Sequence, residues 1–201
     1  MSTPYMTDPA LLAALRGQQY VVLRPGAAVA ANYESEQAAV LQRLPSGIPH
    51  PSTGHVTLRG FFEPDRVPSL RNTIATWARI MSPIDLTAVA IDGFPTPFRV
   101  LHVRLERTDS LVRAYASLTD MLETTDLFRI GELALGEWVF HMSLAYASDL
   151  GEAEWEEILA TSRRELAPPP RETVSYVDFV WYDADGEHIE SLSLGMPVGE
   201  A

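Results

Sequence analysis

The sequence predicts an α+β fold made of two copies of one unit, and two observations lead to this prediction. The residues His55-Val56-Thr57-Leu58 return as His141-Met142-Ser143-Leu144 with conservative changes only. Each copy lies in a run typical of a strand, and a helix, a proline and a hairpin follow it in the same order. The spacings within the two copies agree to one residue, which is within the uncertainty of element ends. We therefore expect one domain over residues 1–201, with repeat units at 55–107 and 141–194.

Apolar spacing and chain breakers define the elements of the first half. Asp8-Pro9 is a good start for a short helix that ends at Gly17, and residues 1–17 are expected to form an N-terminal surface appendage. A strand over 18–24 precedes Pro25-Gly26, which ends it. The following elements are a helix over 29–44, the first motif strand, a helix over 65–81, and a hairpin with strands at 84–91 and 98–107.

The second half repeats this order. A helix over 109–124 precedes the second motif strand, which runs over about 137–147. A helix over 152–166 follows, and Pro168-Pro169-Pro170 ends it. The last elements are a hairpin with strands at 173–181 and 187–194, and a flexible tail at 195–201.

The composition excludes several classes of function. The chain has no cysteine, so disulfides and thiolate metal sites are impossible. Its net charge is −12, and all 15 of its Lys/Arg residues are arginine. A long nucleic acid is not an expected partner, because no basic run could neutralise its phosphates, whereas a small phosphoester, a nucleotide or an RNA end in a local pocket remains compatible. We find neither a membrane span nor a secretory signal, so we expect a cytoplasmic monomer that does not act on membranes.

The motif strands predict a shared cavity. Residues two apart in a strand point to the same face, so His55, Thr57 and Arg59 share one face, as do His141 and Ser143. The opposite faces are apolar and are expected to be buried under helices. Two such strands facing each other would hold two imidazoles and two hydroxyls around one small cavity.

Two histidines and two hydroxyls suit the cleavage of a phosphodiester. The ordinary histidine pKa of about 6.5 lets one imidazole accept a proton while the other donates one near neutral pH. Thr57 and Ser143 could donate hydrogen bonds to the phosphate oxygens, and the scheme needs no metal or other cofactor. A zinc site formed by His55, His141 and a carboxylate is less favoured, because no acidic residue recurs beside the motifs.

These motifs resemble the two HxT/Sx signatures of the 2H phosphoesterase superfamily, which contains 2′-5′ RNA ligase-like proteins and cyclic phosphodiesterases. The resemblance covers residues 18–194. It implies a bilobal fold in which two antiparallel sheets face a central cleft with helices on the outside, and metal-independent action on cyclic phosphates or 2′,5′ bonds. By the same resemblance, His55 and His141 are the catalytic residues and Thr57 and Ser143 bind the phosphate.

Four further residues are candidates for lining the cleft: Arg59, His102, Arg104 and Tyr146. The arginines would supply charge to a phosphate, and Tyr146 would stack on a base. Each also has a simpler interpretation, as a salt-bridged strand residue for the arginines, a hydrogen-bonded sheet residue for His102, and a core aromatic for Tyr146.

We predict a phosphoesterase that opens 2′,3′-cyclic phosphates or cleaves 2′,5′-type phosphodiesters by two-histidine acid/base catalysis. The alternative is a module of the same fold that binds a nucleotide or an RNA end without cleaving it, which the acidic composition favours. Ligation of RNA ends is the same chemistry in reverse, and the scarcity of positive charge disfavours it.

Overall fold

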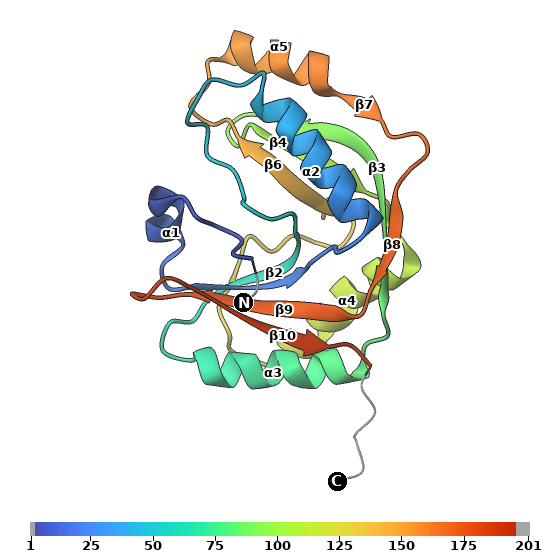
Figure 1. Ribbon diagram of the computed structural model, residues 1–201. Coiled ribbons are helices and arrows are strands. Elements are labelled where there is room, and N and C mark those ends of the chain that lie inside the picture. Colours follow the sequence, from blue (N-terminus) through green and yellow to red (C-terminus); the bar gives the residue numbers. More distant parts are fainter. Residues whose placement is uncertain (1–2, 196–201) are drawn as a thin grey trace.

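The computed structural model describes residues 3–195, in which five helices and ten strands form an α+β structure (Figure 1). The helices are α1 (Pro9–Leu15), α2 (Ala28–Leu41), α3 (Val67–Ile80), α4 (Asp109–Glu123) and α5 (Glu152–Ser162). The strands are β1 (Gln18–Leu23), β2 (Val56–Phe62), β3 (Ile84–Phe94), β4 (Val100–Leu105), β5 (Arg129–Ile130), β6 (His141–Tyr146), β7 (Arg164–Glu165), β8 (Arg171–Val174), β9 (Tyr176–Tyr182) and β10 (Glu187–Ser193).

The strands form two antiparallel sheets, as the sequence predicts. The first-motif sheet has the order β10-β9-β1-β2-β5, and the second-motif sheet has the order β6-β4-β3-β7, with β8 also paired to β3. The hairpin of each repeat unit lies in the sheet of the other motif: β3 and β4 join β6, whereas β9 and β10 join β2 through β1. This exchange ties the two halves of the chain together.

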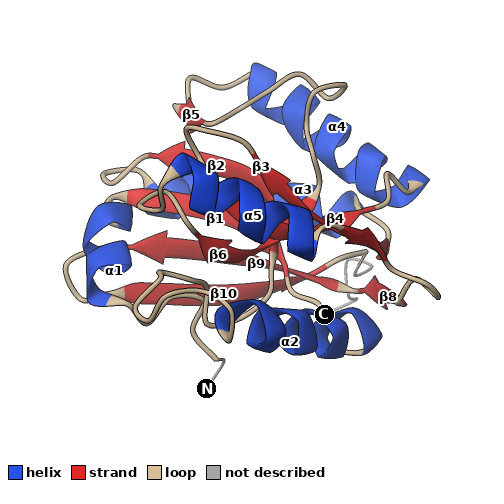
Figure 2. Cartoon of the chain, turned by 90° about the horizontal axis from the view of Figure 1, so that it is seen from above, coloured by secondary structure: helices blue, strands red, loops and turns tan. Residues whose placement is uncertain are grey.

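The helices cover the outside of the sheets. Figure 1 shows α3 below the first-motif sheet and α5 above the second-motif sheet, and Figure 2 shows α2 and α4 at opposite sides of the strands. The helix α3 contacts β9 and β10 through an apolar stripe that includes Leu70, Ile74 and Trp77, as its sequence period predicts. No helix within residues 3–195 is long and apolar enough to cross a membrane.

Both motif strands contribute to one continuous core. Leu58 of β2 and Leu144 of β6 are fully buried members of the same apolar cluster, together with Trp77 and Tyr115. The side of each motif strand opposite to its histidine is therefore anchored in the core.

Three elements differ from the sequence prediction, and one of them is the two-residue strand β5, which the sequence analysis does not predict. The last helix ends at Ser162 rather than near residue 166, because Arg164 and Glu165 extend and pair with β3 as the short strand β7. The run over 173–181 is two strands instead of one: β8 pairs with β3, and β9 pairs with β1 and β10 in the other sheet. The apolar pattern of the sequence predicts only which side chains are buried, so it does not reveal that the chain changes sheets at Ser175.

The N-terminal segment is only in part the surface appendage that the sequence suggests, because α1 has no buried residue whereas the residues before it include two that are buried. Tyr5 and Met6 are only 1% and 7% exposed, and they form a second apolar cluster with Val22, Val180 and Tyr182. The expected flexible tail lies outside the described residues except for Gly195.

Candidate active site

Both motif strands carry a β-bulge at the same position of the motif. In β2, Thr57 pairs with Val22 and Arg59 pairs with Val21, so Leu58 is an extra residue. In β6, the register of Ser143 and Ala145 against β4 likewise leaves Leu144 without a partner. A bulge bends the strand and interrupts its alternation. Beyond the fourth residue of each motif, the simple alternation of faces therefore fails.

The first bulge removes Arg59 from the cleft, contrary to the sequence prediction. Arg59 follows Leu58 into the core and is 1% exposed. Its guanidinium lies 4.3 Å from the centre of the Tyr115 ring and forms a 2.8 Å ion pair with Glu132. Arg59 therefore joins β2 to α4 and does not supply charge to a ligand between the motifs.

The second bulge has the opposite effect on Tyr146. Leu144 and Ala145 are both fully buried, so the next residue returns to the face that carries His141 and Ser143. Tyr146 lines the hollow between the two sheets, together with Ser143. The residue selected from the sequence as a candidate lining residue thus lies at the site, although strict alternation would place it on the other face.

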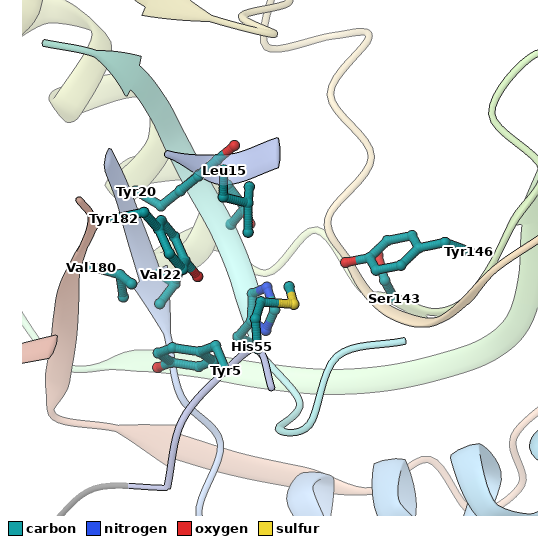
Figure 3. Close-up of a pocket in the computed structure, with 11 residues that line it drawn as sticks. Tyr5, Leu15, Tyr20, Val22, His55, Ser143, Tyr146, Val180 and Tyr182 are labelled. Carbon is teal, nitrogen blue, oxygen red and sulfur yellow. The ribbon is translucent and has the colours of Figure 1, made fainter. Parts of the chain in front are cut away.

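The hollow lies between the sheets and is bounded by both motifs. Figure 3 shows His55 beside Tyr5, with Ser143 and Tyr146 across the hollow. Its volume is about 130 Å³, which corresponds to about four water molecules at roughly 30 Å³ each. The lining residues are Tyr5, Met6, Leu15, Tyr20, Val22, His55, Thr57, Ser143, Tyr146, Val180 and Tyr182.

The two motif histidines are held in the same way. The Nδ1 atom of His55 lies 3.0 Å from the carbonyl oxygen of Thr53, and that of His141 lies 2.8 Å from the carbonyl oxygen of Val139. A carbonyl only accepts, so Nδ1 carries the proton in both rings. In a neutral ring Nε2 is then unprotonated, so its lone pair can accept a proton from a substrate or from water.

The charge of His141 acts on the imidazole of His55. Burial lowers the pKa of His55 to about 4; the Thr53 carbonyl raises this pKa, and the charges of His141 and Arg24 lower it further. Burial also lowers the pKa of His141, against the effect of its bond to Val139. His141 does not line the hollow, but its charge reaches His55 because β2 and β6 are in contact. Both rings are therefore neutral near pH 7 when no ligand is bound.

His102 lies underneath His141 rather than in the hollow. It is 2% exposed, stacks on Phe94 with ring centres 4.3 Å apart, and its ring centre is 5.3 Å from that of His141. Burial, followed by the charge of His141, lowers the pKa of His102 to about 4. The side chain supports the second motif from below, and it pairs across the strands with Ser143.

Arg104 shares the sheet face of His141 but does not line the hollow. The two residues pair directly across β4 and β6. The Arg104 guanidinium bonds to Glu165 at 3.2 Å and lies 4.0 Å from Asp92, and its side chain is 42% exposed. Its charge is thus already shared with two carboxylates.

Helix α2 fixes the two motifs relative to each other. The Tyr33 hydroxyl donates to the carbonyl of Ser143 at 2.9 Å. Gln37, one turn later, donates to the carbonyl of Pro51 at 2.9 Å and to that of Leu144 at 3.1 Å. Because residues four apart share a helix face, one side of α2 connects the loop before His55 to the strand of the second motif.

Several lining residues have no signal in the sequence. Tyr20 and Val22 alternate in β1, as do Val180 and Tyr182 in β9, but nothing in the sequence shows that these two strands are neighbours. The contributions of Tyr5, Met6 and Leu15 depend on where the N-terminal segment folds back, which composition does not reveal.

The hollow and the two motifs provide acid/base groups and hydroxyls, but no cluster of metal ligands. Residues 3–195 contain no group of three or more histidine, aspartate or glutamate side chains placed to hold a metal ion. The zinc site considered from the sequence therefore lacks a third ligand beside His55 and His141. What remains is a hollow with imidazole on one side and hydroxyls on both sides.

Comparisons with known proteins agree with this fold. The family model of the 2′-5′ RNA ligase superfamily matches residues 33–186. No curated protein matches the sequence. Three similar solved structures are TT0787 of Thermus thermophilus (TM-score 0.63, 18% identity, 89% of this chain and 98% of that chain), E. coli LigT complexed with 3′-AMP (0.55, 14%, 90% and 98%) and Usb1 of Kluyveromyces marxianus (0.52, 11%, 90% and 100%).

Proposed function

Because the chain belongs to the 2′-5′ RNA ligase superfamily, we propose that it is a phosphoesterase that opens 2′,3′-cyclic phosphates of nucleotides by two-histidine acid/base catalysis. Family membership supports a 2H phosphoesterase-type function in general. The observation that carries the finer proposal is the matched pair of imidazoles, each with Nδ1 tied to the carbonyl two residues earlier and each followed by a hydroxyl residue on the same face.

In the proposed reaction, a water oxygen forms a bond to phosphorus and the bond from phosphorus to one ribose oxygen breaks. One imidazole takes the proton of the water at Nε2, and the other, protonated in the bound complex, gives its proton to the leaving ribose oxygen. The negative charge of the bound phosphate raises the pKa of a neighbouring imidazole and so favours this protonated form. Exchange of protons with solvent restores both rings after product release.

The hydroxyls would stabilise the charge on phosphorus. Thr57 and Ser143 line the hollow from opposite sheets, so each can donate to a different non-bridging oxygen. The proposed reaction needs no metal ion. Small nucleotides are the proposed ligands, and E. coli LigT, a structural neighbour, was solved with 3′-AMP and with NADP⁺.

The proposal is tested by turnover of 2′,3′-cyclic AMP in the presence of EDTA. His55→Ala and His141→Ala should each lower kcat by roughly 10²-fold to 10⁴-fold, the usual contribution of a positioned acid or base. His188→Ala is the matched control, because this histidine lies against Trp181 and Asp183 in the β9–β10 hairpin. Full turnover in either motif variant, or loss of turnover with EDTA, would reject the proposal.

One observation favours a second candidate, a module that binds a nucleotide without cleaving it. None of the residues that line the hollow is an arginine, so little positive charge is available to a developing transition state. This candidate predicts that 2′,3′-cyclic AMP binds and is recovered unchanged after long incubation. Formation of adenosine 2′- or 3′-monophosphate by the wild type, but not by the motif variants, would exclude it.

A further inference from the structure

The N-terminal segment forms one wall of the hollow. Tyr5, Met6 and Leu15 line it, and the centres of the Tyr5 and His55 rings are 4.8 Å apart with the ring planes 72° from parallel. The segment lies outside the part of the chain that matches the family model, which begins at residue 33. Figure 3 shows Tyr5 and Leu15 on the side of the hollow that faces Ser143 and Tyr146.

The wall is fastened on two sides. The carboxylate of Glu187 in β10 accepts hydrogen bonds from the backbone N–H groups of Tyr5 and Met6, at 2.7 and 3.0 Å. On the other side, the backbone N–H of Ser52 donates to the carbonyl of Tyr5 at 2.7 Å, and the Thr53 hydroxyl donates to the carbonyl of Pro4 at 2.9 Å. Ser52 and Thr53 belong to the loop that delivers His55, so the wall and the first motif are mechanically connected.

The Tyr5 side chain is fixed from below. Its hydroxyl donates to the buried carboxylate of Asp178 at 2.7 Å, and the guanidinium of Arg24 lies 4.0 Å above its ring while bonding to the same carboxylate at 2.9 Å. A tyrosine held at its hydroxyl, its ring face and its backbone does not swing aside at low cost. The position of this wall is therefore a fixed property of the site.

The wall limits what fits beside the phosphate. The hollow of about 130 Å³ is smaller than the roughly 300–1,000 Å³ of typical sites for small organic ligands. The rest of the lining is tyrosine, valine, leucine and methionine, with no cation that would hold a second phosphate. Such a space suits one uncharged planar ring rather than a continuing sugar-phosphate chain.

Building on the proposed phosphoesterase function, we propose that residues Tyr5–Leu15 are a specificity wall that restricts the substrate to a mononucleoside 2′,3′-cyclic phosphate and rejects the cyclic end of an RNA chain. Met6 and Leu15 act as the specificity-determining residues, because their side chains line the hollow whereas Met6 joins the network that fixes Tyr5 only through its backbone N–H. Their removal widens the hollow while Glu187 and Asp178 still hold the segment in place.

The test compares kcat/KM for 2′,3′-cyclic AMP with kcat/KM for a hexanucleotide that ends in the same cyclic phosphate. The wild type should prefer the mononucleotide, and the double variant Met6→Ala/Leu15→Ala should raise the ratio of hexanucleotide to mononucleotide by about tenfold or more. Leu12→Ala is the matched control, because Leu12 packs against the same cluster from α1 but does not line the hollow. Thermal unfolding checks that all variants are folded.

An unchanged ratio in the folded double variant, or a wild type that prefers the hexanucleotide, would overturn the proposed wall. A double variant that does not fold is replaced by Met6→Trp, which fills the hollow and should raise KM for 2′,3′-cyclic AMP several-fold; an unaltered KM counts against the wall. Absence of all turnover would instead overturn the proposed function. The wall is then tested by calorimetry with 3′-AMP and a hexanucleotide 3′-phosphate, where the same change in the ratio of Kd values is expected.

Discussion

The burial of His102 makes the stability of the fold sensitive to acid. An unfolded chain protonates histidine with a pKa of about 6.5, whereas burial and the charge of His141 lower the pKa of His102 to about 4 in the folded protein. Between pH 6.5 and pH 4 the His102 imidazole is therefore protonated in the unfolded chain but neutral in the folded protein. The stabilisation is complete above pH 6.5 and is lost progressively as the pH falls toward 4.

The size of this effect follows from the two pKa values. One pKa unit corresponds to about 1.4 kcal/mol. The titration of His102 therefore makes the free energy of unfolding about 2 kcal/mol lower at pH 5 than at pH 7.5. Because His102 is only 2% exposed, solvent screening reduces this free-energy change little. His102→Leu and His102→Asn remove the titrating group and should lose about 2 kcal/mol less than the wild type over the same interval.

The assay is urea unfolding of the wild type and the two variants at pH 7.5 and pH 5, followed by tryptophan fluorescence. Each variant is compared with itself at the two pH values, so any loss of packing cancels. The contribution of His55 remains in all three proteins and cancels, whereas His141, whose ring centre is 5.3 Å from that of His102, is coupled to it and is part of the measured difference. An equal loss of stability in wild type and variants would show that His102 does not carry the acid sensitivity and that its burial has been misjudged.

Three further outcomes are expected. Arg59→Ala should lower the free energy of unfolding by about 3 kcal/mol, since it truncates a buried side chain and removes the contacts of its guanidinium with Glu132, Tyr115 and Thr119, and urea unfolding measures this loss. Thr57→Val should lower kcat/KM for 2′,3′-cyclic AMP by about 10²-fold without a change in melting temperature, as the loss of one donor to a developing charge predicts; a change below threefold would contradict a phosphate contact. Because the pKa values of His55 and His141 are both lowered, the pH profile of kcat/KM should peak below pH 6.5; a maximum above pH 7 would contradict it.

The motif pair was readable from the sequence because a strand imposes a simple rule. His55 and Thr57, like His141 and Ser143, are two residues apart, so they share a face in any strand. The agreement of the two repeat spacings also required only the printed sequence. Both predictions depend on local geometry, and local geometry is what a sequence pattern reports.

The fate of Arg59 shows where this reasoning stops. Its sequence position places it on the same face as Thr57, yet the bulge at Leu58 turns it into the core. The bulge arises from the pairing of β2 with β1, and it cannot be predicted from the residues of the motif. The same is true of Tyr146, whose return to the hollow depends on the pairing of β6 with β4.

By itself, the sequence determined the α+β class, the duplicated unit and the pairing of imidazole with hydroxyl in each motif, because these follow from periods of two and of 3.6 residues along the chain. Only the tertiary structure decided which strands became neighbours, that Tyr5 returns to lie against His55, and that His102 is buried beneath His141. These contacts join residues far apart in the chain, and their free energy depends on the whole core rather than on any local pattern.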